Sequence, residues 1–290
     1  MTVLKTVRHI YPAPPKHWVG DGFYVSSMFH YGETHKNVDP FLLMDYGSPM
    51  HFDAHAGQPR GVGEHPHRGF ETVTIAYQGE VSHKDATGGN GTIHTGDVQW
   101  MTAGSGVMHE EFHSDEFSKT GGVFEMVQLW VNLPAKDKMT APNYHTIKNA
   151  DIPVVALDKG SVRVIAGDFD GTQGTARPFS PLNLWDTRLQ TGANHTFNVP
   201  DSHNLLILVL DGEILVNEQL VKPSQLVTFE KGGTEFNITA KSDSKILILS
   251  GEPLNEPIAG HGPFVMNTRE EILQAFDDLR SGKFVAIARD

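Results

Sequence analysis

The sequence of 290 residues contains no cysteine. This absence excludes disulfide-stabilised scaffolds, cysteine-based zinc sites, iron–sulfur clusters and thiol nucleophiles. Histidine and carboxylate side chains remain as metal ligands, so any metal site in this chain has to be built from them. The length suits one large domain or two ordinary domains, each with a buried core.

Positive charge is scarce and unclustered. The chain has 23 lysine and arginine residues against 35 aspartate and glutamate residues, which gives a formal net charge of −12, and it has no block of basic residues. Proteins that bind nucleic acid directly rely on clustered positive charge, so we predict no direct contact with nucleic acid.

Long apolar runs are absent as well. The longest uninterrupted aliphatic stretch spans residues 205–210, far short of the ~20 apolar residues that cross a bilayer. Residues 1–10 include Lys5, Arg8 and His9 but no apolar segment, so no signal peptide is predicted. We therefore expect a cytoplasmic protein without membrane contact.

Histidine, in contrast, is abundant and unevenly distributed. Half of the 16 histidines fall between residues 51 and 113, where even spacing would place about 3.5 of them. They are His51, His55, His65, His67, His83, His94, His109 and His113. We predict that this segment carries the chemistry of the protein.

Most of the chain consists of short β-branched and aromatic runs bounded by turn residues, at a spacing of about ten residues that is typical of sandwiches and barrels. The predicted strands are 41–46, 71–77, 81–85, 97–101, 107–112 and 123–131, then 162–166, 184–189, 195–199, 205–209, 213–216, 226–229, 236–239 and 245–249. A polar, proline-containing connector at 133–142 separates the two sets. The pattern predicts an all-β protein with two barrels in tandem.

One helix is predicted near the C-terminus. Residues 268–271 fit a capping box, and Gly282 suits the position that follows a helix. The apolar stripe between them consists of Ile272, Leu273, Phe276 and Leu279. We interpret this helix as a packing element that docks onto a barrel.

The most informative segment is Glu64-His65-Pro66-His67-Arg68-Gly69-Phe70-Glu71. In an extended chain residues i and i+2 point to the same face, so His65 and His67 can present two imidazoles to one point. A second pair with this spacing, His109 and Glu111, lies in another predicted strand. The two pairs together would make a set of three histidines and one carboxylate.

Such a set suits Fe(II), Mn(II), Co(II), Ni(II) or Zn(II). Four protein ligands leave two positions of an octahedron open for substrate, dioxygen or both. A tetrahedral zinc ion with the same four ligands would be filled and inert. The coordination number therefore decides whether the metal reacts, and both cases stay open at this stage.

Two longer patterns resemble a known superfamily. The spacing of Gly63, His65, His67, Glu71 and Gly79 resembles the first cupin motif, and residues 96–104 leading to His109 resemble the second. More narrowly, the runs 65–72, 97–104, 128–134 and 262–268 look like the signature runs of the pirins. This resemblance extends from about Phe41 to the C-terminal helix.

The resemblance to pirins implies a bicupin fold with a short C-terminal helix. It implies an N-terminal metal-binding cupin domain at 1–133 and a C-terminal metal-free cupin domain with the helix at 134–290. One divalent metal, preferably Fe(II), would be bound by residues matching His65, His67, His109 and Glu111. In ordinary cupins the carboxylate ligand matches Glu71; we follow the pirin pattern, because Glu111 shares a strand face with His109.

The resemblance also implies a function. Pirins resemble quercetin 2,3-dioxygenases, which open the central ring of a flavonol with O₂, so a small flavonol-like substrate and O₂ are the expected reactants. Glu111 is the predicted catalytic residue, acting as ligand and general base in turn. The alternative is a redox-responsive iron-binding regulator that acts through a protein partner, a transcription factor or a metabolic enzyme, without turnover. A third hypothesis is a purely structural metal site.

Overall fold

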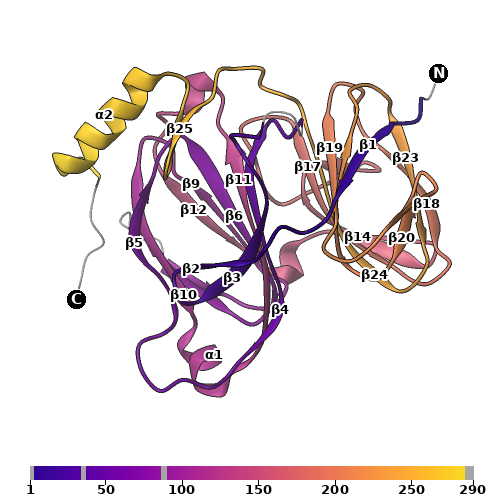
Figure 1. The fold of residues 1–290 in the computed structure, drawn as a ribbon, viewed down its shortest axis with the longest axis horizontal. Helices are drawn as coiled ribbons and strands as arrows, with labels where there is room; N and C mark the ends of the chain where they lie inside the picture. The colour runs from indigo at the N-terminus through magenta and orange to yellow at the C-terminus, as the bar shows by residue number, and fades with distance from the viewer. Residues whose placement is uncertain (1–2, 34–36, 86–89, 285–290) are drawn as a thin grey trace. The chain divides into compact units, whose positions relative to one another are not determined.

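The computed structural model describes residues 3–33, 37–85 and 90–284. The chain divides into two compact units, and each is made of strands from distant parts of the sequence. The first unit comprises Pro15–Gly32, Phe41–Asn149 and Asn255–Asp290, and the second comprises Met1–Pro14, Glu33–Pro40 and Ala150–Leu254. Figure 1 shows the strands and helices of both units along the chain.

The first unit contains a seven-stranded sheet in the order β12-β9-β6-β11-β4-β3-β2 and a four-stranded sheet in the order β5-β10-β7-β8. Its elements are β2 (His17–Val19), β3 (Phe23–His30), β4 (Phe41–Phe52), β5 (Gly61–His67), β6 (Phe70–Gln78), β7 (Val81–Asp85), β8 (Asn90–Ile93), β9 (Val98–Thr102), β10 (Val107–His113), α1 (Asp115–Thr120), β11 (Gly122–Asn132), β12 (Asn143–Ile147), β25 (Ala259–His261), β26 (Phe264–Met266) and α2 (Arg269–Arg280). All pairings within the two sheets are antiparallel.

The second unit repeats this architecture, with sheet orders β1-β22-β19-β24-β17-β14-β13 and β18-β23-β20-β21. Its elements are β1 (Val7–Tyr11), β13 (Val154–Leu157), β14 (Gly160–Ala166), β15 (Asp168–Phe169), β16 (Thr172–Gln173), β17 (Leu182–Leu189), β18 (Asn194–Asn198), β19 (Asn204–Asp211), β20 (Ile214–Val216), β21 (Gln219–Val221), β22 (Leu226–Phe229), β23 (Glu235–Ala240) and β24 (Ser244–Gly251). Two 3-10 helices, η2 (Ala135–Asp137) and η3 (Asn149–Asp151), complete the described elements. The predicted all-β fold of two barrels with a C-terminal helix is confirmed.

The two barrels differ in what fills them. The core of the second unit is a continuous apolar cluster built from both of its sheets, in which the rings of Phe197 and Phe236 stack at 5.2 Å. Trp185 also belongs to this cluster and is fully buried. In the first unit the corresponding strands carry buried polar side chains, including Thr74, Gln99 and His109. Buried polar groups need partners or a ligand, so the first unit is where a site is expected.

Strand positions were predicted well where alternation is strong. The predicted strand 81–85 coincides with β7, and the predicted strand 107–112 with β10 except for its last residue. The short strands β1, β2 and β3 before residue 41, and the helix α1, were not predicted. These elements are short or have mixed polarity, so their position depends on tertiary pairing such as that of β3 with β4.

The division into units differs from the predicted boundary after residue 133. The first fourteen residues belong to the second unit, because β1 pairs with β22. The helix α2 belongs to the first unit, together with β25 and β26. The chain therefore crosses between its units more than once, and a single cut in the sequence cannot describe them.

The helix α2 begins and ends as predicted. Thr268 is the N-cap and forms a capping box with Glu271, and Gly282 has a φ of +72° just after the C-cap. The predicted apolar stripe is wrong at Leu273, which is 55% exposed, while Ala275 is buried against Phe264. At 12 residues α2 is the longest described helix, and none of the described helices has the length and apolarity to cross a membrane.

A buried ion pair fixes α2 to the first barrel. Arg68 Nη1 donates to Asp278 Oδ2 at 2.8 Å, and the two residues are 4% and 6% exposed. Hydrogen bonds from Lys283 and Arg68 hold the pKa of Asp278 well below its usual range. Arg68 directly follows the second histidine of the predicted metal pair, so α2 supports the strand that carries it.

We expect Asp278→Ala to destabilise the protein by about 3–5 kcal/mol, because it leaves the Arg68 guanidinium buried without its carboxylate. Urea unfolding followed by circular dichroism measures this. Asp277→Ala is the matched control: its carboxylate is exposed and pairs with Arg280 on the helix surface, so a change within about 0.5 kcal/mol is expected. Equal losses in the two variants would contradict this role of Asp278.

Candidate metal centre

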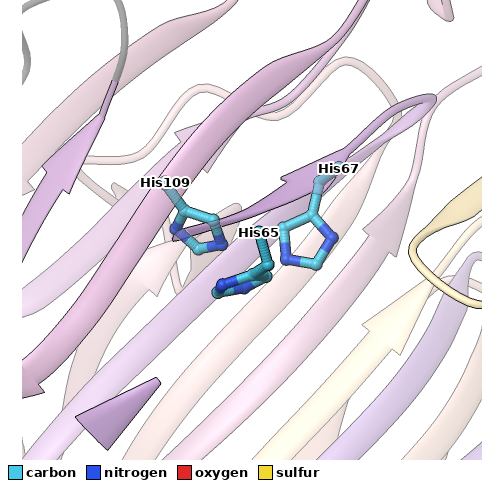
Figure 2. A group of neighbouring side chains, drawn as sticks. All are labelled: His65, His67 and His109. Carbon is cyan, nitrogen blue, oxygen red and sulfur yellow. The ribbon is translucent and has the colours of Figure 1, made fainter. Parts of the chain in front are cut away.

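Three imidazoles converge inside the first barrel (Figure 2). His65 and His67 lie on β5, and His109 lies on the neighbouring strand β10. The antiparallel register places His109 opposite His65 and Val107 opposite His67. One ligand nitrogen of each histidine lies within 4.8 Å of those of the other two, so this group could hold a metal ion.

The local sequence explains how β5 presents both rings. β5 is an edge strand, where the missing N–H of Pro66 leaves no ladder hydrogen bond unmade. The chain then turns sharply at Gly69, which has a φ of +90°; an added Cβ would lie 2.0 Å from the Val265 carbonyl oxygen. The buried Lys138 Nζ donates to the carbonyls of Gly69 and Val265, at 2.8 and 3.0 Å, and holds this turn in place.

Hydrogen bonding at His65 and burial at His67 and His109 suit these rings to metal binding. His65 Nδ1 lies 2.8 Å from the Gly63 carbonyl oxygen, which can only accept, so Nδ1 carries the proton and Nε2 is free to bind a metal. Burial, with the neighbouring histidines, holds the pKa of His67 and His109 well below the usual value, so both rings are neutral. Neutral imidazole is the ligand form of histidine.

Two buried nitrogen atoms at this centre lack a hydrogen bond. His67 Nδ1 and His109 Nε2 have no partner among the described residues. A buried polar atom without a partner costs free energy, and a bound metal ion would satisfy both. The donor set therefore fits a metal ion.

Glu111 lies two residues beyond His109, and the alternating burial of β10 puts both side chains on the buried face. Its Oε2 accepts from Gln128 Nε2 at 3.0 Å and its Oε1 accepts from Thr74 Oγ1 at 3.4 Å. A carboxylate oxygen of Glu111 lies within 4.8 Å of ring nitrogens of His83 and His109, and these three residues form one possible metal-binding group. The group that contains His65 and His67 does not include Glu111. His109 thus belongs to both groups.

His83 was not predicted to be at the centre. It lies on β7, which pairs with β10 on the side away from β5. Its Nδ1 lies 3.4 Å from His109 Nδ1 and 3.0 Å from Gln99 Nε2, and its ring stacks on Tyr144 at 4.6 Å. His83 thus contacts the ring of His109 and, with His109 and Glu111, makes up the second group that could hold a metal ion.

A cavity of about 390 Å³ opens beside the histidines. It is lined by Val19, Phe23, Val25, Asp45, Val62, His65, Pro66, His67, Glu111, Met126, Gln128, Trp130 and Pro263. Most of its wall is apolar, which is typical of small-molecule sites that use few polar groups for orientation. Sequence analysis did not identify Asp45, Gln128 and Trp130 as site residues; they lie on β4 and β11 rather than on the strands that carry the predicted ligands.

Comparison with known proteins agrees with this architecture. The family described as Pirin matches residues 22–131, and the family described as the Pirin C-terminal cupin domain matches residues 184–285. The chain belongs to the pirin family. The predicted resemblance is thereby confirmed.

Relatives of this pirin match over nearly their whole length. A Pseudomonas aeruginosa protein named "Putative quercetin 2,3-dioxygenase" is 50% identical over 284 residues, which cover 97% of this chain and 99% of the relative. The Mus musculus protein named Pirin is 37% identical over 254 residues, or 86% of this chain and 83% of that protein. A crystal structure described as quercetin 2,3-dioxygenase from Acinetobacter baumannii has a TM-score of 0.95 and 52% identity, covering 99% of this chain and 100% of that one.

Glu71, the carboxylate that ordinary cupins would place at the metal, points the other way in this pirin. Glu71 and Thr74 are three residues apart on β6, so their side chains lie on opposite faces. Thr74 contacts Glu111, whereas Glu71 accepts from Thr102 Oγ1 at 2.8 Å. Burial raises the pKa of Glu71 to about 7, although Trp100 and Thr102 lower it in part.

The raised pKa of Glu71 predicts a pH dependence. Between its usual pKa of 4.5 and about 7, the folded protein keeps a proton that the unfolded chain has released, so stability falls as the pH rises through this window. Glu71→Gln should remove this loss. The stability of the variant relative to the wild type should therefore be about 3 kcal/mol greater at pH 8 than at pH 4.5, and its metal content should be unchanged. Urea unfolding at both pH values and elemental analysis test this; loss of the metal would contradict the assignment of Glu71 to the other face.

Three of the four other histidines between residues 51 and 113 have partners outside this centre. His51 and His94 are exposed on their side chains and lie near Asp53 and Glu80. His113 is buried, and its Nε2 donates to the Gly22 carbonyl at 2.9 Å. His51 and His94 therefore make surface contacts, whereas His113 packs inside the first unit.

Proposed function

We propose that this pirin is a metal-dependent dioxygenase of the quercetin 2,3-dioxygenase type, which opens a flavonol ring with O₂. The observation that carries the proposal is the convergence of three imidazoles beside a cavity that is lined by His65, His67 and Glu111. Relatives named for this activity match over the full chain, which supports the same assignment.

The proposed metal ligands are His65, His67, His109 and Glu111, with one divalent ion, preferably Fe(II), per chain. Imidazole and carboxylate together suit first-row divalent ions such as iron, manganese, cobalt and nickel. A bound ion of this kind supplies joint activation of a flavonol and O₂ when it keeps open coordination positions. Neighbouring groups hold the ligands: Gly63 orients His65, and His83 contacts His109.

The residues around the cavity would bind and orient the substrate. Phe23, Val25 and Met126 provide apolar surface for an aromatic ring, and Trp130 lies 5.2 Å from the His67 ring. Apolar walls around a bound substrate would displace water from it, which strengthens electrostatic interactions inside the cavity. Glu111 is the proposed general base that accepts the proton of the 3-hydroxyl of a flavonol.

The decisive experiment loads the purified protein with Fe(II) without O₂, measures the metal stoichiometry, then adds quercetin in air and follows the loss of flavonol absorbance. Turnover that requires both the metal and O₂ supports the proposal, and His65→Ala serves as the metal-poor control. Absence of turnover at full occupancy with iron, manganese, cobalt and nickel would contradict it. That result would favour the redox-responsive regulator acting through a protein partner.

A further inference from the structure

The cavity beside the histidines has a second carboxylate. Asp45 lies in the middle of β4, where it is opposite Ser27 of β3 and opposite Gln128 of β11. It lines the cavity and is 8% exposed. Gln128, which pairs with Asp45 across the strands, donates to the Glu111 carboxylate.

Apolar side chains line the cavity on both strands that flank Asp45. Phe23 and Val25 of β3 and Met126 of β11 line the same cavity on the strands that flank it. A buried carboxylate on an apolar surface is costly unless hydrogen bonds compensate it. The position is therefore unusual for a side chain that only fills space.

The hydrogen bonds of Asp45 leave capacity for a ligand. Ser27 Oγ donates to Asp45 Oδ1 at 2.5 Å. A carboxylate can accept about four hydrogen bonds, and a cavity-lining carboxylate can take further ones from a bound molecule. Burial raises the pKa of Asp45, while the Ser27 hydrogen bond and the exposed His17 lower it.

We infer that Asp45 is a specificity residue that selects ligands carrying a second hydroxyl group in addition to the oxygen that faces the histidines and Glu111. This inference rests on the proposed function and narrows it. A flavonol with hydroxyls beyond its 3-hydroxyl would donate one of them to the Asp45 carboxylate. A flavonol with the 3-hydroxyl alone would leave that carboxylate desolvated without a donor.

The test compares two ligands and three proteins in the absence of O₂, so that no substrate is consumed. Quercetin and 3-hydroxyflavone, which keeps only the 3-hydroxyl, are titrated into Fe(II)-loaded wild-type, Asp45→Ala and Asp45→Asn proteins, and Kd is obtained by isothermal calorimetry. The wild type should bind quercetin about 10- to 100-fold more tightly than 3-hydroxyflavone, the range expected for a hydrogen bond to a charged group. In Asp45→Ala this ratio should fall to within about threefold, with Asp45→Asn in between.

Glu125→Gln is the matched control. Glu125 is a buried carboxylate on β11 that accepts from Tyr46 and Gln78 and does not line this cavity, so its substitution should leave the ratio of the two Kd values unchanged. A wild-type ratio near one, or an Asp45→Ala variant that weakens both ligands by the same factor, would overturn the inference. The inference would also be overturned if neither ligand bound the wild-type protein.

The same proteins separate this inference from the proposed function. Selective binding that depends on Asp45 but is followed by no turnover in air would sustain the specificity role and refute the dioxygenase. Turnover of both flavonols with equal kcat/KM in wild type and Asp45→Ala would sustain the dioxygenase and refute the specificity role.

Discussion

His109→Ala is expected to lower the affinity for Fe(II) by more than about 100-fold and to abolish turnover. Changing a group that only supports a metal ligand costs about 10- to 100-fold in affinity, and His109 is a proposed ligand itself. It is fully buried and is the one residue shared by both groups that could hold a metal ion among the described residues. Metal content after dialysis against a competing chelator measures the effect.

The control for His109→Ala is His145→Ala. His145 lies on β12 of the same unit and is exposed, so its loss should leave the metal content and the thermal midpoint unchanged. Circular dichroism establishes that the His109 variant is folded. A folded His109→Ala protein with full metal content would show that the ion is held by other residues.

Glu111→Gln is expected to lower kcat on quercetin by about 100- to 10,000-fold, the range for losing a general base, with most of the metal retained. Glutamine has nearly the shape of glutamate, and three imidazoles remain to hold the ion. The glutamine side chain, however, cannot accept a proton from the substrate hydroxyl at neutral pH. Steady-state kinetics on protein of measured metal content separates loss of the base from loss of the metal.

Glu110→Gln is the matched control for this variant. Glu110 precedes Glu111 on β10 and lies on the opposite, half-buried face, so kcat should stay within a factor of two of the wild type. Retained turnover in Glu111→Gln at full metal occupancy would remove Glu111 from the role of base and leave it, at most, a ligand.

The parts of the fold that could be predicted are those whose pattern is local. β10 alternates buried and half-buried residues along its length, and its period of two was readable before the structure was known. The capping box of α2 was readable for the same reason, because it joins residues three apart. The exposed Leu273 shows the limit: helical spacing alone left the centre of the buried face uncertain by one residue, and packing against Phe264 decided it.

The candidate site divides in the same way. The spacing of His65 with His67 and of His109 with Glu111 predicted two pairs, and the register of β5 against β10 brings the histidines together. The bulge in this register between His109 and Glu111 has no signal in the sequence. It accompanies the grouping of Glu111 with His83 rather than with His65.

By itself the sequence predicted the candidate ligand types and the two-barrel fold, because these depend on composition and on spacings within single strands, and its longer motifs resembled those of the pirins. Only the tertiary structure decided that Glu71 points away from Glu111, that α2 packs on the first unit, and that Asp45 lines the cavity. Each of these depends on which strands lie side by side. Asp45 and Glu111 are far apart in sequence; the pairing of β4 with β11 places Asp45 opposite Gln128, which donates to Glu111, and both carboxylates line one cavity.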